Sequence, residues 1–186
     1  IGGFFGANIN DPEFHELLIR LFEYGCFCPV MRLHGYRWPL QPQYGTTGGA
    51  TCVSGAPNEV WSYTDQVCEI LSDYLRLRER MLPYITELME EAHEKGTPVM
   101  RPLFYDFPED KESWNVETEY MFGSKVLVKP ITDVDARETD VYLPGGASWT
   151  NAWTGETFEG GQTVHVAAPI EQIPLFTRDG YKLPVK

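Results

Sequence analysis

Apolar residues recur at three- and four-residue spacing from Phe14 to Phe22, the period of a helix with one buried face. The segment Asp11-Pro12-Glu13 just before them has the composition of a helix start, with Asp as N-cap, Pro at the first helical position and Glu near the positive end of the dipole. The pattern therefore predicts a helix over residues 12–24, which Gly25 ends.

A second helical pattern runs from Val67 to Ala92. Ser62 with Asp65 resembles an N-cap followed by an acidic third residue, and Lys95-Gly96 is typical of a helix end. Pro83 should kink this long helix or divide it in two, because proline cannot donate the helical hydrogen bond.

Between the two helices, Cys28-Pro29-Val30-Met31 is interpreted as a short buried strand, and residues 35–61 as a long loop rich in Gly, Pro, Thr and Gln. Residues 1–96 thus alternate helix, strand and helix, which favours α/β architecture. A (β/α)₈ barrel needs about 250 residues, so this part covers about two of its units. We expect either a fragment of a larger barrel protein or a barrel completed by another chain, with wide apolar edges if isolated.

The period changes in residues 97–186, where short strand-like runs alternate with Gly, Pro and Asp. This half is predicted to form a small antiparallel β-sandwich. The runs are Val99 to Phe104, Tyr120 to Phe122, Lys125 to Ile131, Thr139 to Leu143, Ser148 to Trp153, Thr163 to Ala167 and Ile173 to Phe176.

Composition and charge exclude several classes of function. The formal net charge is −12, and no Lys/Arg cluster could follow a phosphate backbone, so neither nucleic acid nor an anionic membrane is an expected partner. The spacing of the four cysteines is not that of a zinc site, and no metal is predicted. Cysteines interpreted as small buried residues suggest a reducing, cytoplasmic location. The aromatic content of 13% is compatible with sugar binding, but it favours a tightly packed aromatic core.

Candidate chemistry lies at the end of the predicted strand, where Arg32-Leu33-His34-Gly35 leads into the long loop. In a β/α barrel this is the mouth of the active site, because barrel enzymes build their chemistry from strand C-termini and the loops that follow. A neutral imidazole can donate from one nitrogen and accept at the other, which suits a vicinal diol. Strand alternation puts Arg32 on the same side as His34.

In series, these and other segments resemble glycoside hydrolase family 31, which contains retaining α-glucosidases and α-xylosidases. Each motif alone is weak, but together they cover nearly the whole chain in consistent order. The motifs are Ile1-Gly2-Gly3-Phe4, Cys28-Pro29-Val30-Met31-Arg32-Leu33-His34-Gly35, Leu75 to Ile85, Glu91 to Leu103, Tyr120-Met121-Phe122-Gly123, Val141-Tyr142-Leu143-Pro144, Trp153-Thr154-Gly155-Glu156 and Ile173-Pro174-Leu175-Phe176.

The resemblance implies the C-terminal part of a barrel, residues 1–96, followed by a β-sandwich, residues 97–186. It implies hydrolysis of an oligosaccharide or α-glycoside through two aspartates, a nucleophile and a general acid/base, without any cofactor. Both aspartates are expected upstream of Ile1, so this chain would carry neither and would be inactive alone, with the remainder of the barrel as its partner. By the same resemblance, His34, Arg32 and Phe4 are the expected substrate-binding residues of the −1 subsite.

Three aromatic residues of the long loop, Trp38, Tyr44 and Trp61, could form a substrate-facing wall or pack locally. Asn58-Glu59 resembles an acid/base pair used by another clan of barrel glycosidases, although here it lies in a loop. Two alternatives to hydrolysis stay open. One is a non-catalytic carbohydrate-binding or structural module that stacks sugars on Trp149 and Trp153. The other is an α-glucan lyase or transglycosylase with the same pocket.

Overall fold

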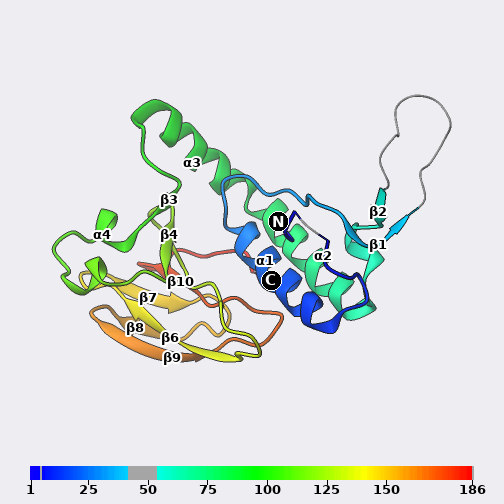
Figure 1. Ribbon diagram of the computed structural model, residues 1–186. Helices are drawn as coiled ribbons and strands as arrows, with labels where there is room; N and C mark the ends of the chain where they lie inside the picture. The colour runs from blue at the N-terminus through cyan, green and yellow to red at the C-terminus, as the bar shows by residue number, and fades with distance from the viewer. Residues whose placement is uncertain (5, 42–53, 186) are drawn as a thin grey trace.

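The structure is a computed structural model that describes residues 1–4, 6–41 and 54–185. Its first half is helical, and α1 and α2 lie side by side in it while α3 extends away from them (Figure 1). The elements of this half are α1 (Pro12–Cys26), β1 (Arg37–Gln41), β2 (Ser54–Ala56), the one-turn helix η1 (Val60–Ser62), α2 (Asp65–Arg80) and α3 (Leu82–Lys95).

The helix starts follow from capping. The Asp11 side chain accepts a hydrogen bond from the backbone N–H of Glu13, and Pro12 occupies the first turn of α1, as the sequence predicts. The N-cap of α2 is Thr64, whose hydroxyl accepts from the Val67 N–H over 3.3 Å, so the expected cap at Ser62 is wrong by two residues. Pro83 divides the long helix as predicted, because α2 ends at Arg80 and α3 begins at Leu82.

The strand expected at residues 28–31 is absent from the described structure. Val30 is 78% exposed there. Two carbonyl groups of this segment accept from Arg78 on α2, at 2.5 Å for Cys28 and 2.9 Å for Pro29, instead of from a neighbouring strand. A buried barrel strand needs partners along both edges, and the described residues do not supply them.

The second half is a two-layered antiparallel β-domain. Within the described residues, one layer is a six-stranded sheet in the order β3-β4-β5-β10-β7-β8 and the other is the pair β6-β9. Its elements are β3 (Met100–Arg101), α4 (Leu103–Asp106), η2 (Glu112–Trp114), β4 (Tyr120–Phe122), β5 (Val126–Val128), β6 (Glu138–Leu143), β7 (Ser148–Asn151), β8 (Thr157–Glu159), β9 (Gln162–Ala167) and β10 (Leu175–Arg178).

Each predicted run in this half overlaps a strand, but several of the strands are shorter than the run. The run expected from Val99 to Phe104 forms only β3, because Pro102 interrupts it and α4 follows. Strand β8 was not predicted, since Thr157–Glu159 is only three residues long and mostly exposed.

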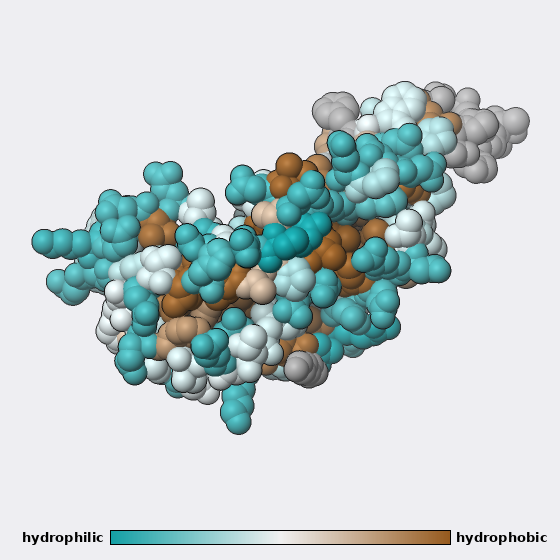
Figure 2. Space-filling model, turned by 90° about the horizontal axis from the view of Figure 1, so that it is seen from below, coloured by the Kyte–Doolittle hydropathy of each residue, from teal (hydrophilic) through white to brown (hydrophobic). Residues whose placement is uncertain are grey.

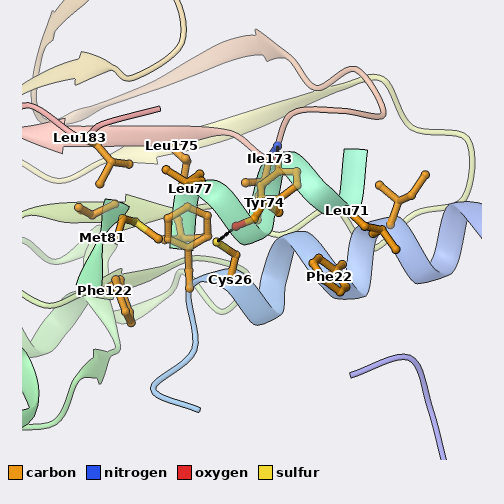
Figure 3. Close-up of a cluster of buried hydrophobic side chains, with 14 of the residues drawn as sticks. Phe22, Cys26, Leu71, Tyr74, Leu77, Met81, Phe122, Ile173, Leu175 and Leu183 are labelled. Atoms are coloured by element: carbon orange, nitrogen blue, oxygen red, sulfur yellow. Dashed lines mark hydrogen bonds between the residues drawn. The ribbon is translucent and has the colours of Figure 1, made fainter. Parts of the chain in front are cut away.

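The described residues form two apolar cores, of which only the second joins the two halves. One fills the space between the two layers of the β-domain and includes Trp149 and Phe176. The other joins α1 and α2 to the same six-stranded sheet, so that helical and sheet side chains interdigitate (Figure 3). In this second core Cys26 donates a weak hydrogen bond from its thiol to the Tyr74 carbonyl at 3.5 Å.

The helical half also presents apolar side chains to solvent, as the sequence leads us to expect of a partial barrel. Seen from below, apolar atoms are visible over this half (Figure 2). None of the helices in the described ranges is long and apolar enough to cross a membrane. The exposed apolar residues on its helices and the segment after α1 include Leu17, Val30, Leu75, Leu82 and Met89.

Candidate functional site

The first residues of the chain run beside the segment that carries the candidate site. The Ile1 amino group donates to the Arg32 carbonyl at 2.8 Å, and the His34 N–H donates to the Ile1 carbonyl at 3.4 Å. Two such bonds, one on either side of residue 33, are the pattern of a parallel strand pair. Further on, Asn8 and Trp38 form a parallel bridge. The two segments therefore run in the same direction, like neighbouring barrel strands.

This pairing brings two of the predicted site residues together. The rings of Phe4 and His34 lie 5.3 Å apart between centroids and are inclined by 42°. Phe4 is 58% exposed, and His34 is exposed too. An apolar ring and an imidazole that can both donate and accept hydrogen bonds are thus exposed side by side. The ring can pack against the C–H face of a sugar, and the imidazole can bind its hydroxyl groups.

Arg32 is exposed, and among the described residues its side chain forms no hydrogen bond or ion pair. Its backbone carbonyl belongs to the parallel pairing described above. Among the described residues, its guanidinium group therefore forms no hydrogen bond with His34 and no cation–π contact with Phe4, and its role in the subsite stays a prediction.

The predicted aromatic wall is only partly assembled. Trp61 on η1 is 73% exposed and lines an open cleft of about 1040 Å³ together with Gly35, Tyr36 and Asn58. Trp38 is 45% exposed and meets the Tyr36 ring edge-on at 6.4 Å between centroids. Tyr44 lies outside the described residues.

Glu59, the candidate acid of the alternative Asn-Glu pair, is an exposed carboxylate that accepts from the Ser62 hydroxyl at 3.0 Å. Its own backbone N–H and the Ser62 hydroxyl lower the pKa of Glu59. A general acid that works near neutral pH needs a raised pKa, so this environment does not favour such a role.

The β-domain offers no stacking surface at Trp149. Its ring is completely buried, and its indole N–H donates to the Pro144 carbonyl at 2.9 Å. Trp153 is half-buried and donates in the same way to the Ile173 carbonyl at 2.7 Å. The expectation that Trp149 could bind a glycan by stacking is therefore wrong, because burial in the core leaves no ring face accessible.

Sequence reasoning missed Arg37, which lies three residues after His34. Its side chain is completely buried between the candidate site and α1, with the guanidinium group 4.8 Å from the Phe14 ring centroid. The only available signal was an arginine placed between two aromatic residues, Tyr36 and Trp38, which does not reveal burial.

Comparison with known proteins gives two family matches that follow one another along the chain. Residues 1–88 match the description "Glycosyl hydrolases family 31 TIM-barrel domain". Residues 96–183 match "Glycosyl hydrolase family 31 C-terminal domain". The two matched ranges correspond to the helical half and the β-domain described above.

The chain is also similar to individual enzymes. It is 35% identical to an alpha-xylosidase of Saccharolobus solfataricus over 99% of this chain and 23% of the relative. It is 35% identical to alpha-glucosidase 2 of Bacillus thermoamyloliquefaciens over 97% of this chain and 20% of the relative. A crystal structure of an alpha-xylosidase from a soil metagenome, complexed with xylose, superposes with a TM-score of 0.93 at 47% identity, over 98% of this chain and 27% of the other. The chain thus spans about a quarter or less of each.

Proposed function

Because the chain belongs to glycoside hydrolase family 31, we propose that it is the part of a retaining α-glycosidase that forms one wall of the −1 subsite. The substrate is an α-xyloside or an α-glucoside. The observation that carries the proposal is the proximity of Phe4 and His34, 5.3 Å apart at the end of two paired parallel segments.

In this role His34 holds hydroxyl groups of the sugar, and Phe4 packs against its C–H face. The imidazole donates to one hydroxyl and accepts from its neighbour, which fixes the ring orientation relative to the reacting carbon. Arg32, two residues before His34, orients nearby carboxylates. The open cleft beside Gly35, with Trp61 on its wall, receives the leaving-group side of the substrate.

The two reacting aspartates come from a segment outside this chain. One attacks the anomeric carbon and the other protonates the leaving oxygen and later activates water, so the product keeps the configuration of the substrate. The contribution of this chain is positional, through hydrogen bonds that tighten as the sugar distorts toward the transition state. The similarity to an alpha-xylosidase complexed with xylose supports an α-xyloside as the first substrate to test.

The experiment compares the complete enzyme that carries this segment with the 186-residue chain alone. We expect the complete enzyme to hydrolyse an aryl α-xyloside or an aryl α-glucoside and to release the α-anomer first, as followed by proton NMR. The 186-residue chain should show no turnover, because it contains neither aspartate.

Release of the β-anomer would contradict the retaining mechanism. An unsaturated product would indicate a lyase, and a new glycoside in the absence of free sugar would indicate a transglycosylase. Turnover by the 186-residue chain would contradict the placement of the aspartates and direct attention to Glu59.

A further inference from the structure

Arg37 carries a positive charge into the interior, and no carboxylate among the described residues pairs with it. The side chain is completely buried. Its guanidinium group donates instead to three carbonyls, those of Gly2 at 2.8 Å, Gly3 at 3.2 Å and Tyr36 at 3.0 Å. Burying a charge costs several kcal/mol unless its donors are well satisfied, so these bonds hold Arg37 in one geometry.

A second set of bonds continues from the same guanidinium group. Arg37 Nε donates to the Tyr63 hydroxyl at 3.1 Å, and that hydroxyl donates to Asn58 Oδ1 at 2.6 Å. The Asn58 side-chain amide then donates to the Gly35 carbonyl at 3.3 Å. The network therefore reaches from Gly2 and Gly3 at one end to Gly35, the residue after His34, at the other.

The two ends of this network flank the two rings of the candidate subsite. Gly3 directly precedes Phe4, and Gly35 directly follows His34. Their backbones are in close contact, since a Cβ atom on Gly35 would lie 2.2 Å from the Gly3 carbonyl oxygen. A Cβ atom on Gly2 would likewise lie 2.6 Å from Arg37 Nη2.

We propose that Arg37, Tyr63 and Asn58 are positioning residues that set the placement of Phe4 and His34 relative to each other, an inference that rests on the proposed function. Of the three, Asn58 lines the open cleft, whereas Arg37 and Tyr63 do not. They act through the backbone carbonyls of Gly3 and Gly35, so that a displaced bond in the network shifts the imidazole against the phenyl ring. Misplacement of a binding group by about 1 Å costs an enzyme on the order of a hundredfold in rate.

The test is a double-mutant cycle in the complete enzyme, with kcat/KM for the aryl α-glycoside as the measurement. Tyr63→Phe removes the hydroxyl that joins Arg37 to Asn58 and keeps the ring. We expect kcat/KM to fall about tenfold in the wild-type background and to stay within about twofold when His34→Ala is already present. Residues that act as one unit show such coupling, whereas independent ones add.

The control is Tyr105→Phe, which also removes a tyrosine hydroxyl but lies on α4, where Tyr105 is 47% exposed. It should leave kcat/KM unchanged in both backgrounds. Asn58→Ala gives a second measurement if Tyr63→Phe does not fold, and it should be coupled to His34→Ala in the same way.

Equal effects of Tyr63→Phe with and without His34→Ala would overturn the proposal, because they would show a role that does not act through His34. No effect in either background would overturn it too. A wild-type enzyme that cleaves neither aryl glycoside, or a His34→Ala variant of full activity, would overturn the proposed function itself, so the two failures can be told apart.

Discussion

The Tyr74 hydroxyl on α2 and the Glu23 carboxylate on α1 are joined by a hydrogen bond of 3.0 Å at the junction with the β-domain. The same hydroxyl accepts from the Ile173 N–H at 3.0 Å, and Arg20 donates to the other oxygen of Glu23 at 3.0 Å. Glu23 is 1% exposed. A polar network therefore crosses an otherwise apolar interface.

Burial raises the pKa of Glu23 from its ordinary 4.5 to about 8, and Arg20 offsets only part of this effect. Between these two values the folded state binds more protons than the unfolded state. The contribution of Glu23 to stability is therefore complete below about pH 4.5 and is lost as the pH rises through about 8.

We expect the free energy of unfolding of the wild type, minus that of Glu23→Gln, to fall steadily from pH 5 to pH 8. Urea unfolding followed by tryptophan fluorescence measures this difference. Glutamine cannot ionise, so other groups that titrate in this range cancel between the two proteins. A difference that stays constant or grows with pH would show that Glu23 ionises readily inside the junction.

Two arginines at this junction should differ sharply in their contribution to stability. Arg20 is buried and donates to the carbonyls of Ala136 and Ala168, at 3.0 and 2.8 Å, as well as to Glu23. Arg137 pairs with Glu16 at 2.7 Å, but its side chain is 45% exposed. Removing Arg20 leaves several buried acceptors without their donor, at about 1–3 kcal/mol each, whereas an exposed ion pair contributes about 0–1 kcal/mol.

We therefore expect Arg20→Met to lower the free energy of unfolding by about 3 kcal/mol and Arg137→Met by less than about 1 kcal/mol. High salt should reduce only the loss caused by Arg137→Met, because exposed charges are screened. Equal losses for the two variants in urea unfolding would contradict this account of the junction.

Gly35 and Gly96 make a matched pair for testing the close backbone contact between Gly3 and Gly35 at the candidate site. Both have positive φ, +106° and +71°, which L side chains rarely adopt. Only at Gly35 would a Cβ atom collide with backbone, since nothing lies within 4 Å of one at Gly96. Gly96→Ala should cost about 1–2 kcal/mol for its backbone conformation alone.

Gly35→Ala should cost at least about twice as much, because the two paired segments must move apart. Thermal unfolding of the two variants compares them directly. Similar losses would mean that the segments separate freely, and that the contact between Gly3 and Gly35 does not hold the site.

The helices and most of the strands along the chain could be predicted from the sequence because their causes are local. The spacing of Phe14 to Phe22, the cap at Asp11 and the break at Pro83 each act within a few residues. The fold class is confirmed by the two family matches as a barrel portion followed by an antiparallel β-domain. The domain boundary at residues 96 and 97 stays a prediction, although Gly96 does end α3.

What the sequence could not predict depends on partners far along the chain. The run from Cys28 to Met31 has a strand-like composition, but the carbonyls of Cys28 and Pro29 accept hydrogen bonds from Arg78 on α2. Arg37 is buried because the carbonyls of Gly2 and Gly3 fold back over it, and nothing in its neighbouring residues encodes this contact. The meeting of Phe4 and His34 was expected from the family resemblance, whereas their roles stay predictions.

The measurement that tests the central claim most directly is kcat/KM of His34→Ala in the complete enzyme, with His93→Ala as control. His93 lies on α3, remote in sequence from the candidate site. If the imidazole binds the sugar in the transition state, His34→Ala should lose at least about 1.4 kcal/mol of stabilisation, a tenfold fall, while His93→Ala stays at the wild-type value. An unchanged kcat/KM for a His34→Ala enzyme that unfolds at the wild-type temperature would contradict the account.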